Sequence, residues 1–198
     1  MSEWEKKRGV MRDYDAAASS YNAQYMEEQE AKIKVALQNL KLKKDCVILD
    51  LGCGTGLLFE HVAEDAKLLV GLDFSENLFK QAKKRVGKSS KIALIRADVD
   101  HIPFKNQIFH YVFAVTLLQN PPNPNKTIKE IQRVTKPNAK IVLTALKKQF
   151  TQKDFAKILR QASFNYILNV ENQTKDHIAI CQKTPIHRVA PASSLTTY

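Results

Sequence analysis

Residues 46–56 read CVILDLGCGTG, an apolar run that leads directly into a turn with alternating glycines. The run from Cys46 to Leu49 predicts a short buried strand, and the polar segment that starts at about Leu57 predicts a helix. Three glycines let the backbone turn tightly and approach a ligand without a Cβ in the way: Gly52, Gly54 and Gly56. This stretch therefore predicts a strand, a turn and a helix, with backbone amides facing a ligand.

The glycine spacing and the acid before it indicate the kind of ligand. A dinucleotide-binding turn reads G-x-G-x-x-G and holds a pyrophosphate at the helix N-terminus. This chain reads G-x-G-x-G, with Asp50 two residues before the first glycine. A carboxylate at that place repels a pyrophosphate and attracts an amino group. The turn favours a cationic cofactor that carries an amino acid; the alternative is a tight glycine turn without a ligand.

The segment DLGCGTG resembles motif I of the class I S-adenosylmethionine (SAM) dependent methyltransferases. The strand-turn-helix context of that motif is predicted here as well. The resemblance implies SAM as the cofactor and S-adenosyl-L-homocysteine as the product. It assigns five residues of this turn to the cofactor site: Asp50, Gly52, Cys53, Gly54 and Gly56.

Two further acids follow the next two predicted strands. Residues 67–73, KLLVGLD, end in Asp73, roughly twenty residues after the turn begins, where a ribose-binding carboxylate is expected. The alternative for Asp73 is a helix cap, although Ser75 already supplies one. Residues 97–104, ADVDHIPF, resemble the third conserved segment of the family. The resemblance gives Asp98 to the adenine amine and Val99 to the adenine ring, and Phe74 joins the cofactor site beside Asp73.

Residues 14–22, YDAAASSYN, resemble the "YD-x-x-A-x-x-Y" signature of the ubiquinone-biosynthesis and tRNA-wobble types of methyltransferase. In those types the segment folds over the cofactor. The resemblance places Tyr21 at the cofactor and Tyr14 at the substrate mouth. The alternative is that the two tyrosines pack as ordinary helix residues.

The loop after the fourth predicted strand contains Asn120-Pro121-Pro122, which looks like the N-P-P-[YF] motif that grips a planar nitrogen. That motif directly follows its strand, whereas Asn120 comes four residues after Thr116 and no aromatic follows the prolines. LLQNPPNP instead matches the "L-x-H-x-x-D-P" loop of the methyltransferase-11 type. Because the loop lies at the carboxyl end of a central strand, it predicts a substrate mouth lined by Leu118, Gln119 and Asn120.

The fourth predicted strand departs from the family pattern. Most relatives have an aspartate in "FD-x-V", whereas this chain reads Phe109-His110-Tyr111-Val112. That acid is usually structural. We therefore expect a changed hydrogen bond near the start of this strand and no loss of activity.

The alternation of strands and helices predicts an α/β fold, a Rossmann-like, seven-stranded and mainly parallel sheet with helices on both faces and a C-terminal antiparallel hairpin. Expected strands cover 46–50, 67–73, 91–96, 110–115, a fifth after a turn at 136–138, 164–170 and 177–182. Expected helices cover 24–40, 57–64, 76–86, 126–134 and 151–162. Residues 14–183 are the predicted domain, after a flexible segment at 1–13 and before a disordered tail at 184–198.

The composition limits the location and the partners of the protein. Three widely spaced cysteines, Cys46, Cys53 and Cys181, favour neither a disulfide framework nor a zinc site, and fit a reducing cytoplasm. We expect no membrane span and no metal. The formal net charge of +11, with lysine-rich stretches at 32–44, 80–96 and 136–148, attracts polyanions. RNA is therefore one substrate class; the alternative is a lysine-rich surface without a nucleic-acid partner.

These observations lead to one leading hypothesis and two alternatives. The first is a SAM-dependent methyltransferase that acts on RNA or a translation component, with a small activating protein subunit as a further partner. The second is a SAM-dependent methyltransferase that acts on a small molecule or a lipid precursor. The third is a SAM-binding regulatory subunit without turnover. Methyl transfer needs mainly alignment and desolvation, and no catalytic base is assigned from the sequence.

Overall fold

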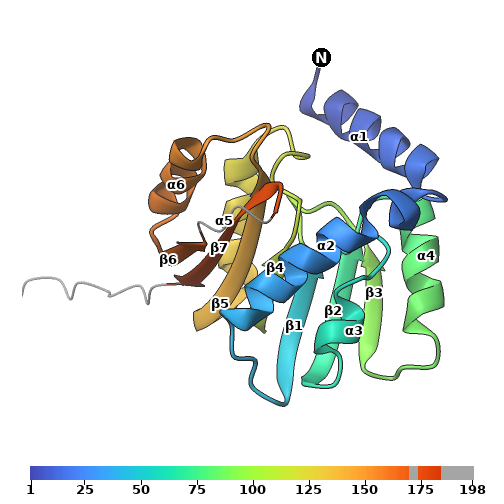
Figure 1. Ribbon diagram of the computed structural model, residues 1–198, viewed down its shortest axis with the longest axis horizontal. Helices are drawn as coiled ribbons and strands as arrows, with labels where there is room; N and C mark the ends of the chain where they lie inside the picture. The colour runs from blue at the N-terminus through green and yellow to red at the C-terminus, as the bar shows by residue number, and fades with distance from the viewer. Residues whose placement is uncertain (170–173, 184–198) are drawn as a thin grey trace, which may run out of the picture.

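The computed structural model describes residues 1–169 and 174–183. Its sheet has seven strands in the order β3-β2-β1-β4-β5-β7-β6 (Figure 1). The strands are β1 (Cys46–Leu51), β2 (Ala66–Asp73), β3 (Ile92–Arg96), β4 (Phe109–Ala114), β5 (Thr135–Leu146), β6 (Phe164–Asn169) and β7 (Asp176–Lys183). The pairs among β1 to β5 are parallel, and β7 runs antiparallel to both β5 and β6. The predicted Rossmann-like sheet with its C-terminal hairpin is confirmed.

Six helices lie in the described residues, and five of them cover the two faces of the sheet (Figure 1). Their bounds are α1 (Glu3–Ala17), α2 (Tyr21–Gln38), α3 (Phe59–Val62), α4 (Glu76–Val86), α5 (Pro124–Val134) and α6 (Gln152–Gln161). Successive strand residues point to opposite faces, so Leu49 packs in the cluster that includes α5 and α6. Its neighbour Ile48 packs in the cluster with α2, α3 and Ala82 of α4. The sheet therefore lies between two apolar layers.

The glycine turn folds back onto β2. The backbone N–H groups of Gly52 and Cys53 both donate to the carbonyl of Leu72, at 2.8 and 3.0 Å. Gly56 has a φ of +80°, and a Cβ on it would lie 2.4 Å from the ring of Phe59. Only glycine fits both the backbone angle and the space. Gly56 therefore serves the turn itself.

The prediction of a flexible segment at residues 1–13 is wrong, because helix α1 covers them from Glu3 onward. Ser2 and Glu5 form a capping box that satisfies the free amides of the first turn. Farther along, Lys7 is buried against carboxylates of the core domain. Local capping and one long-range ion pair thus order a stretch that carries little apolar surface.

Two other boundaries differ from the prediction. Helix α3 has only four residues and begins at Phe59, since the residues after the glycine turn form further turns. The predicted turn at residues 136–138 lies inside β5, which starts at Thr135 and accommodates Asn138 with a φ of +61°. The predicted tail, residues 184–198, and part of the hairpin turn lie outside the described residues. Within 1–169 and 174–183, no helix has the length and apolar character required to cross a bilayer.

Candidate active site

A pocket of about 100 Å³ lies over the carboxyl ends of the parallel strands and under α1. It brings together nine of the predicted site residues: Tyr14, Tyr21, Gly52, Gly54, Asp73, Phe74, Asp98, Val99 and Asn120. A smaller pocket of about 40 Å³ shares Gly52 and Gly54 with it and is lined by Asp50 and Cys53 as well. The three strand-end acids therefore border one connected region, as the topology of a parallel sheet requires.

The loop after β4 differs from the prediction. Leu118, predicted to line the substrate mouth, is 0% exposed and belongs to the core beside α5, so this assignment is wrong. Leu117 lines the pocket in its place. Gln119 lies in a separate groove between the loop and α1, and its side-chain amide donates to the carbonyl of Thr116 at 2.5 Å. The loop is not a regular strand, and hydropathy alone does not fix which of two adjacent leucines faces inward.

Asp73 is held in one orientation by the backbone. Its Oδ2 accepts from the N–H of Gly54 at 2.7 Å, and its Oδ1 accepts from the N–H of Ser75 at 2.8 Å. A carboxylate has about four acceptor positions, so these two bonds leave acceptor capacity for ligand hydroxyls. Burial raises the pKa of Asp73, and the hydrogen bonds from Gly54 and Ser75 oppose that shift.

Asp50 ends up as a buried carboxyl group with a shifted pKa. Its side chain is 4% exposed at the end of β1. Burial, and next the negative charge of Asp73, raise the pKa of Asp50 to about 8. A cationic group placed beside Asp50 would favour its ionised form. The geometry thus agrees with the amino-group preference inferred from the sequence.

We expect the affinity for SAM to rise with pH between pH 6 and 7.5, by up to about ten-fold per pH unit. The free protein keeps the Asp50 proton below about pH 8, and a bound ammonium group expels it. In this range the amino group of the ligand stays mostly charged, since α-amino groups titrate at about 7.7–8.0. Calorimetric titrations with SAM at several pH values measure the slope, and Asp50→Asn should flatten it.

The raised pKa of Asp50 also affects the stability of the fold, which decreases as the pH rises, whereas the affinity for SAM increases. The folded pKa of Asp50 is raised above its ordinary value of 3.8. Its contribution to stability is therefore complete below about pH 4 and is lost as the pH rises through about 8.

For SAM binding, an affinity that still rises with pH in Asp50→Asn would contradict the assignment of this carboxyl group to the amino group of the cofactor.

Asp98 is paired with a cation that no local sequence pattern singles out. The ammonium of Lys7 on α1 lies 2.7 Å from Asp98 Oδ2 and 2.5 Å from Asp100 Oδ2. Burial acts against the charge of Lys7, but the two carboxylates outweigh it and raise the pKa of Lys7. Asp98 Oδ1 also accepts from the N–H of Asp100 at 3.0 Å. Helix α1 is thereby fixed over the predicted adenine end of the site.

Two tyrosines, Tyr14 on α1 and Tyr21 on α2, line the pocket. Tyr14 and Tyr21 have ring centroids 6.1 Å apart, and the side-chain amide of Asn120 donates to the Tyr14 hydroxyl at 3.1 Å. Burial raises the pKa of both tyrosines. Trp4 lies with its ring centroid 5.9 Å from that of Phe74. The phenols are neutral and provide walls rather than a base.

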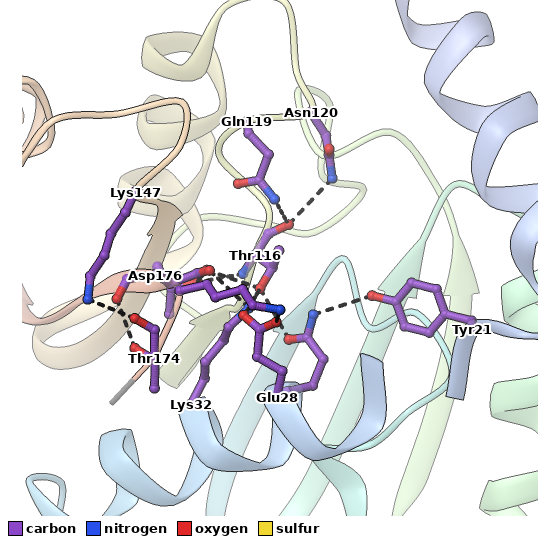
Figure 2. A network of polar contacts seen from close by, with 12 residues as sticks. Tyr21, Glu28, Lys32, Thr116, Gln119, Asn120, Lys147, Thr174 and Asp176 are labelled. Carbon is purple, nitrogen blue, oxygen red and sulfur yellow. Dashed lines mark hydrogen bonds and ion pairs between the residues drawn. The ribbon is translucent and has the colours of Figure 1, made fainter. Parts of the chain in front are cut away.

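A buried polar network supports the mouth from the side of α2 and β7, as Figure 2 shows. Lys32 is 2% exposed, and its ammonium lies 2.9 Å from Asp176 Oδ1 and 2.9 Å from the hydroxyl of Thr116. Thr116 has a φ of +54° at the end of β4, a strained angle for a β-branched residue. The side chain of Gln29 connects Thr116 to the hydroxyl of Tyr21, at 3.1 and 3.4 Å. This network holds a pocket-lining residue in an unusual conformation.

Residues 49–143 match the methyltransferase domain family. These residues form a methyltransferase domain. Family and fold agree with the resemblance drawn from DLGCGTG, and SAM is the cofactor of this domain class. His110, the departure from the family pattern, forms the changed hydrogen bond that was expected: its Nδ1 accepts from the N–H of Val47 at 3.0 Å.

The methyltransferase domain is similar to curated proteins, and the similarity covers only part of the length of each of them. It is 32% identical over 109 residues to a demethylmenaquinone methyltransferase from Bacillus licheniformis, covering 54% of this chain and 47% of that protein. It is 30% identical over 109 residues to a sterol 4-C-methyltransferase from Caenorhabditis elegans, covering 54% of this chain and 33% of that protein. The match thus spans less than half of either relative.

Solved structures share the fold of the methyltransferase domain. One is a phosphoethanolamine N-methyltransferase from Haemonchus contortus with S-adenosylhomocysteine, at a TM-score of 0.71 and 16% identity, covering 88% of this chain and 60% of that one. Another is a methyltransferase from Haloferax volcanii in complex with an activator protein, at a TM-score of 0.75 and 14% identity, covering 87% and 98%. At these identities the likeness concerns the fold.

Proposed function

We propose that this chain transfers a methyl group from SAM to a small, mainly apolar acceptor that binds beneath α1. The observation that carries the proposal is the pocket itself, in which the glycine turn and the strand-end acids face walls of apolar and aromatic side chains. The family match supports methyl transfer as the reaction.

The residues present fit SAM. Asp73 keeps acceptor capacity for the ribose hydroxyls, because the backbone N–H groups beside it do not use all of its roughly four acceptor positions. Asp50 is a buried acid without a cationic partner among the described residues, which suits an amino group. Gly54 has nothing within 4 Å of the position of a Cβ, so a ligand can approach its backbone. Asp98 and Val99 would hold adenine. When bound, SAM supplies a methyl group already activated by its sulfonium.

The chain's own residues then position the acceptor and exclude water. The acceptor side of the pocket is lined by Val10, Met11, Leu117 and Pro121. The only cation that lines the pocket within the described residues is Lys7, and it is already paired with two carboxylates. Alignment and desolvation can supply much of the rate, which accords with the neutral tyrosines and the lack of an evident base there.

The size and polarity of this pocket favour a small molecule over RNA as acceptor. The mouth is covered by α1 and is mainly apolar, and Lys7 is the one cation that lines it in the described residues. The RNA hypothesis rested on the net charge and the lysine-rich stretches at 32–44, 80–96 and 136–148. The names of the two curated relatives refer to a demethylmenaquinone and a sterol, both apolar. An activating subunit stays a proposal as well, supported by the fold-level likeness to a methyltransferase that is bound to an activator.

The test supplies methyl-labelled SAM and the full chain to separate RNA, protein and lipid-soluble extracts. We expect label in a small compound of the lipid-soluble fraction, and no label with Asp73→Asn. Label in RNA alone would contradict the proposed acceptor while leaving the methyltransferase reading intact. Calorimetry without SAM binding would contradict both the enzyme and the regulatory-subunit hypotheses. Binding without labelling of any fraction, also after addition of cell extract as a source of an activator, would favour the regulatory subunit.

A further inference from the structure

A second, larger cavity lies at the amino-terminal ends of β1, β4 and β5. Figure 1 shows these strand ends on the side of the sheet away from α1. Its volume is about 600 Å³, within the roughly 300–1,000 Å³ range of small-molecule sites. The loop before β1 forms one wall, and β6 and the end of β7 form the other. We call it the lysine groove, after the four residues that give it its charge: Lys41, Lys43, Lys136 and Lys140. His110 lines it as well.

The charge of the lysine groove is not balanced. No Asp or Glu lines it within the described residues. None of its four lysines forms an ion pair with a carboxylate in residues 1–169 and 174–183. The partner of Lys140 is the neutral side chain of Gln182, at 2.8 Å. Four ammonium groups around one cavity create a positive potential that attracts a multiply charged anion.

His110 adds a further hydrogen-bond donor to the four lysines of the groove. Its Nδ1 accepts from the backbone N–H of Val47, so the neutral ring must carry its proton on Nε2. Burial and the charge of Lys136 lower the pKa of His110, which keeps the ring neutral. The Nε2 atom lies 2.9 Å from the ammonium of Lys136. Both groups are donors, and an anionic oxygen beside them could accept from both.

The rest of the wall is rigid and partly apolar. The hydroxyl of Tyr111 accepts from the N–H of Lys43 at 3.1 Å and donates to the carbonyl of Lys41 at 3.2 Å, which fixes the lysine-bearing loop. Tyr166 is half-buried in the wall, and Ile167 beside it is 70% exposed. Both residues line the groove, and Ile167 offers exposed apolar surface there.

We propose that the lysine groove binds a small molecule that carries two or more phosphates in series. Such an anion matches four ammonium groups better than a single carboxylate does. Tyr166 and Ile167 would contact its organic part. A single-stranded RNA fits less well, because it requires a succession of aromatic platforms. Of the two tyrosines that line the groove in the described residues, Tyr166 is half-buried and Tyr111 is buried. The proposal does not depend on the acceptor of the methyl group.

The probes are tripolyphosphate and UTP, titrated calorimetrically into the full chain at low salt. UTP has no adenine and so avoids the pocket beside Asp98. Both probes should bind, and saturating SAM should not displace them. His110→Asp should weaken both by about ten-fold or more, because its carboxylate can still accept from Val47 but neutralises Lys136. Lys136→Gln is the second variant and should weaken both to a similar extent.

Lys88→Gln is the matched control. Lys88 is exposed after α4, outside the groove, so this variant removes the same charge from the molecule and should change the affinity by less than about two-fold. Equal weakening by Lys88→Gln and Lys136→Gln would overturn the site, since only the net charge would then matter. Displacement by SAM, no binding of either probe, or binding of a ten-nucleotide oligouridylate alone would also overturn it. Failure of methyl transfer with intact UTP binding would overturn only the proposed function.

Discussion

Asp73→Asn is expected to weaken SAM binding by about 100-fold, which corresponds to about 3 kcal/mol. The carboxylate of Asp73 already accepts two backbone N–H groups, and an amide has a single oxygen for all of its acceptor bonds. The variant therefore loses charge-assisted bonds to the ribose hydroxyls. Calorimetry measures the affinity directly. The emission of Trp4, the one tryptophan of the chain, is a second readout because its ring lies next to that of Phe74, which lines the pocket.

Asp45→Asn is the control for this variant. Asp45 is exposed at the other end of β1, and its φ of +58° is one that asparagine also adopts. It should leave the SAM affinity unchanged. An affinity of Asp73→Asn within about three-fold of the wild type, in a protein that remains folded, would remove Asp73 from the cofactor site.

Asp176→Ala is expected to lower the free energy of unfolding by about 3–5 kcal/mol. Asp176 is 1% exposed and Lys32 is 2% exposed, so the variant leaves a buried ammonium without its main partner. The hydroxyls of Thr116 and Thr144 lose an acceptor at the same time. Urea unfolding followed by circular dichroism measures the change.

Two other variants separate the buried charge from general damage. Lys34→Ala removes an exposed pair with Glu30 on the same helix, and should cost at most about 0.5 kcal/mol. The double variant Lys32→Met with Asp176→Ala should recover part of the lost stability, because neither member of the pair is then left charged. A double variant less stable than Asp176→Ala alone would contradict this account.

Local patterns were sufficient for the sheet and for the position of the acids at the ends of β1 and β2. Asp50 and Asp73 each end an apolar run, and a parallel sheet brings such ends to one edge. No local pattern joins Lys7 to Asp98 or Lys32 to Asp176, because each pair is set by packing between distant segments. Lys7 in particular stands in a mixed-charge stretch that resembles a solvated helix. Its role depends on where α1 docks, which only the three-dimensional arrangement fixes.

Helix α1 is fastened to the residues that directly follow Asp73. The carboxylate of Asp15 accepts from the hydroxyl of Ser75 at 2.5 Å and from the N–H of Asn77 at 2.9 Å, while Ser75 itself donates its N–H to Asp73. The cover of the pocket and the cofactor carboxylate thus share one hydrogen-bond chain. We therefore expect a change in the position of α1 to alter the affinity for SAM as well as for the proposed acceptor. A substitution that loosens α1 to admit a bulkier methyl acceptor would also disturb the SAM site beside Asp73. The range of acceptors would then not evolve independently of the affinity for SAM.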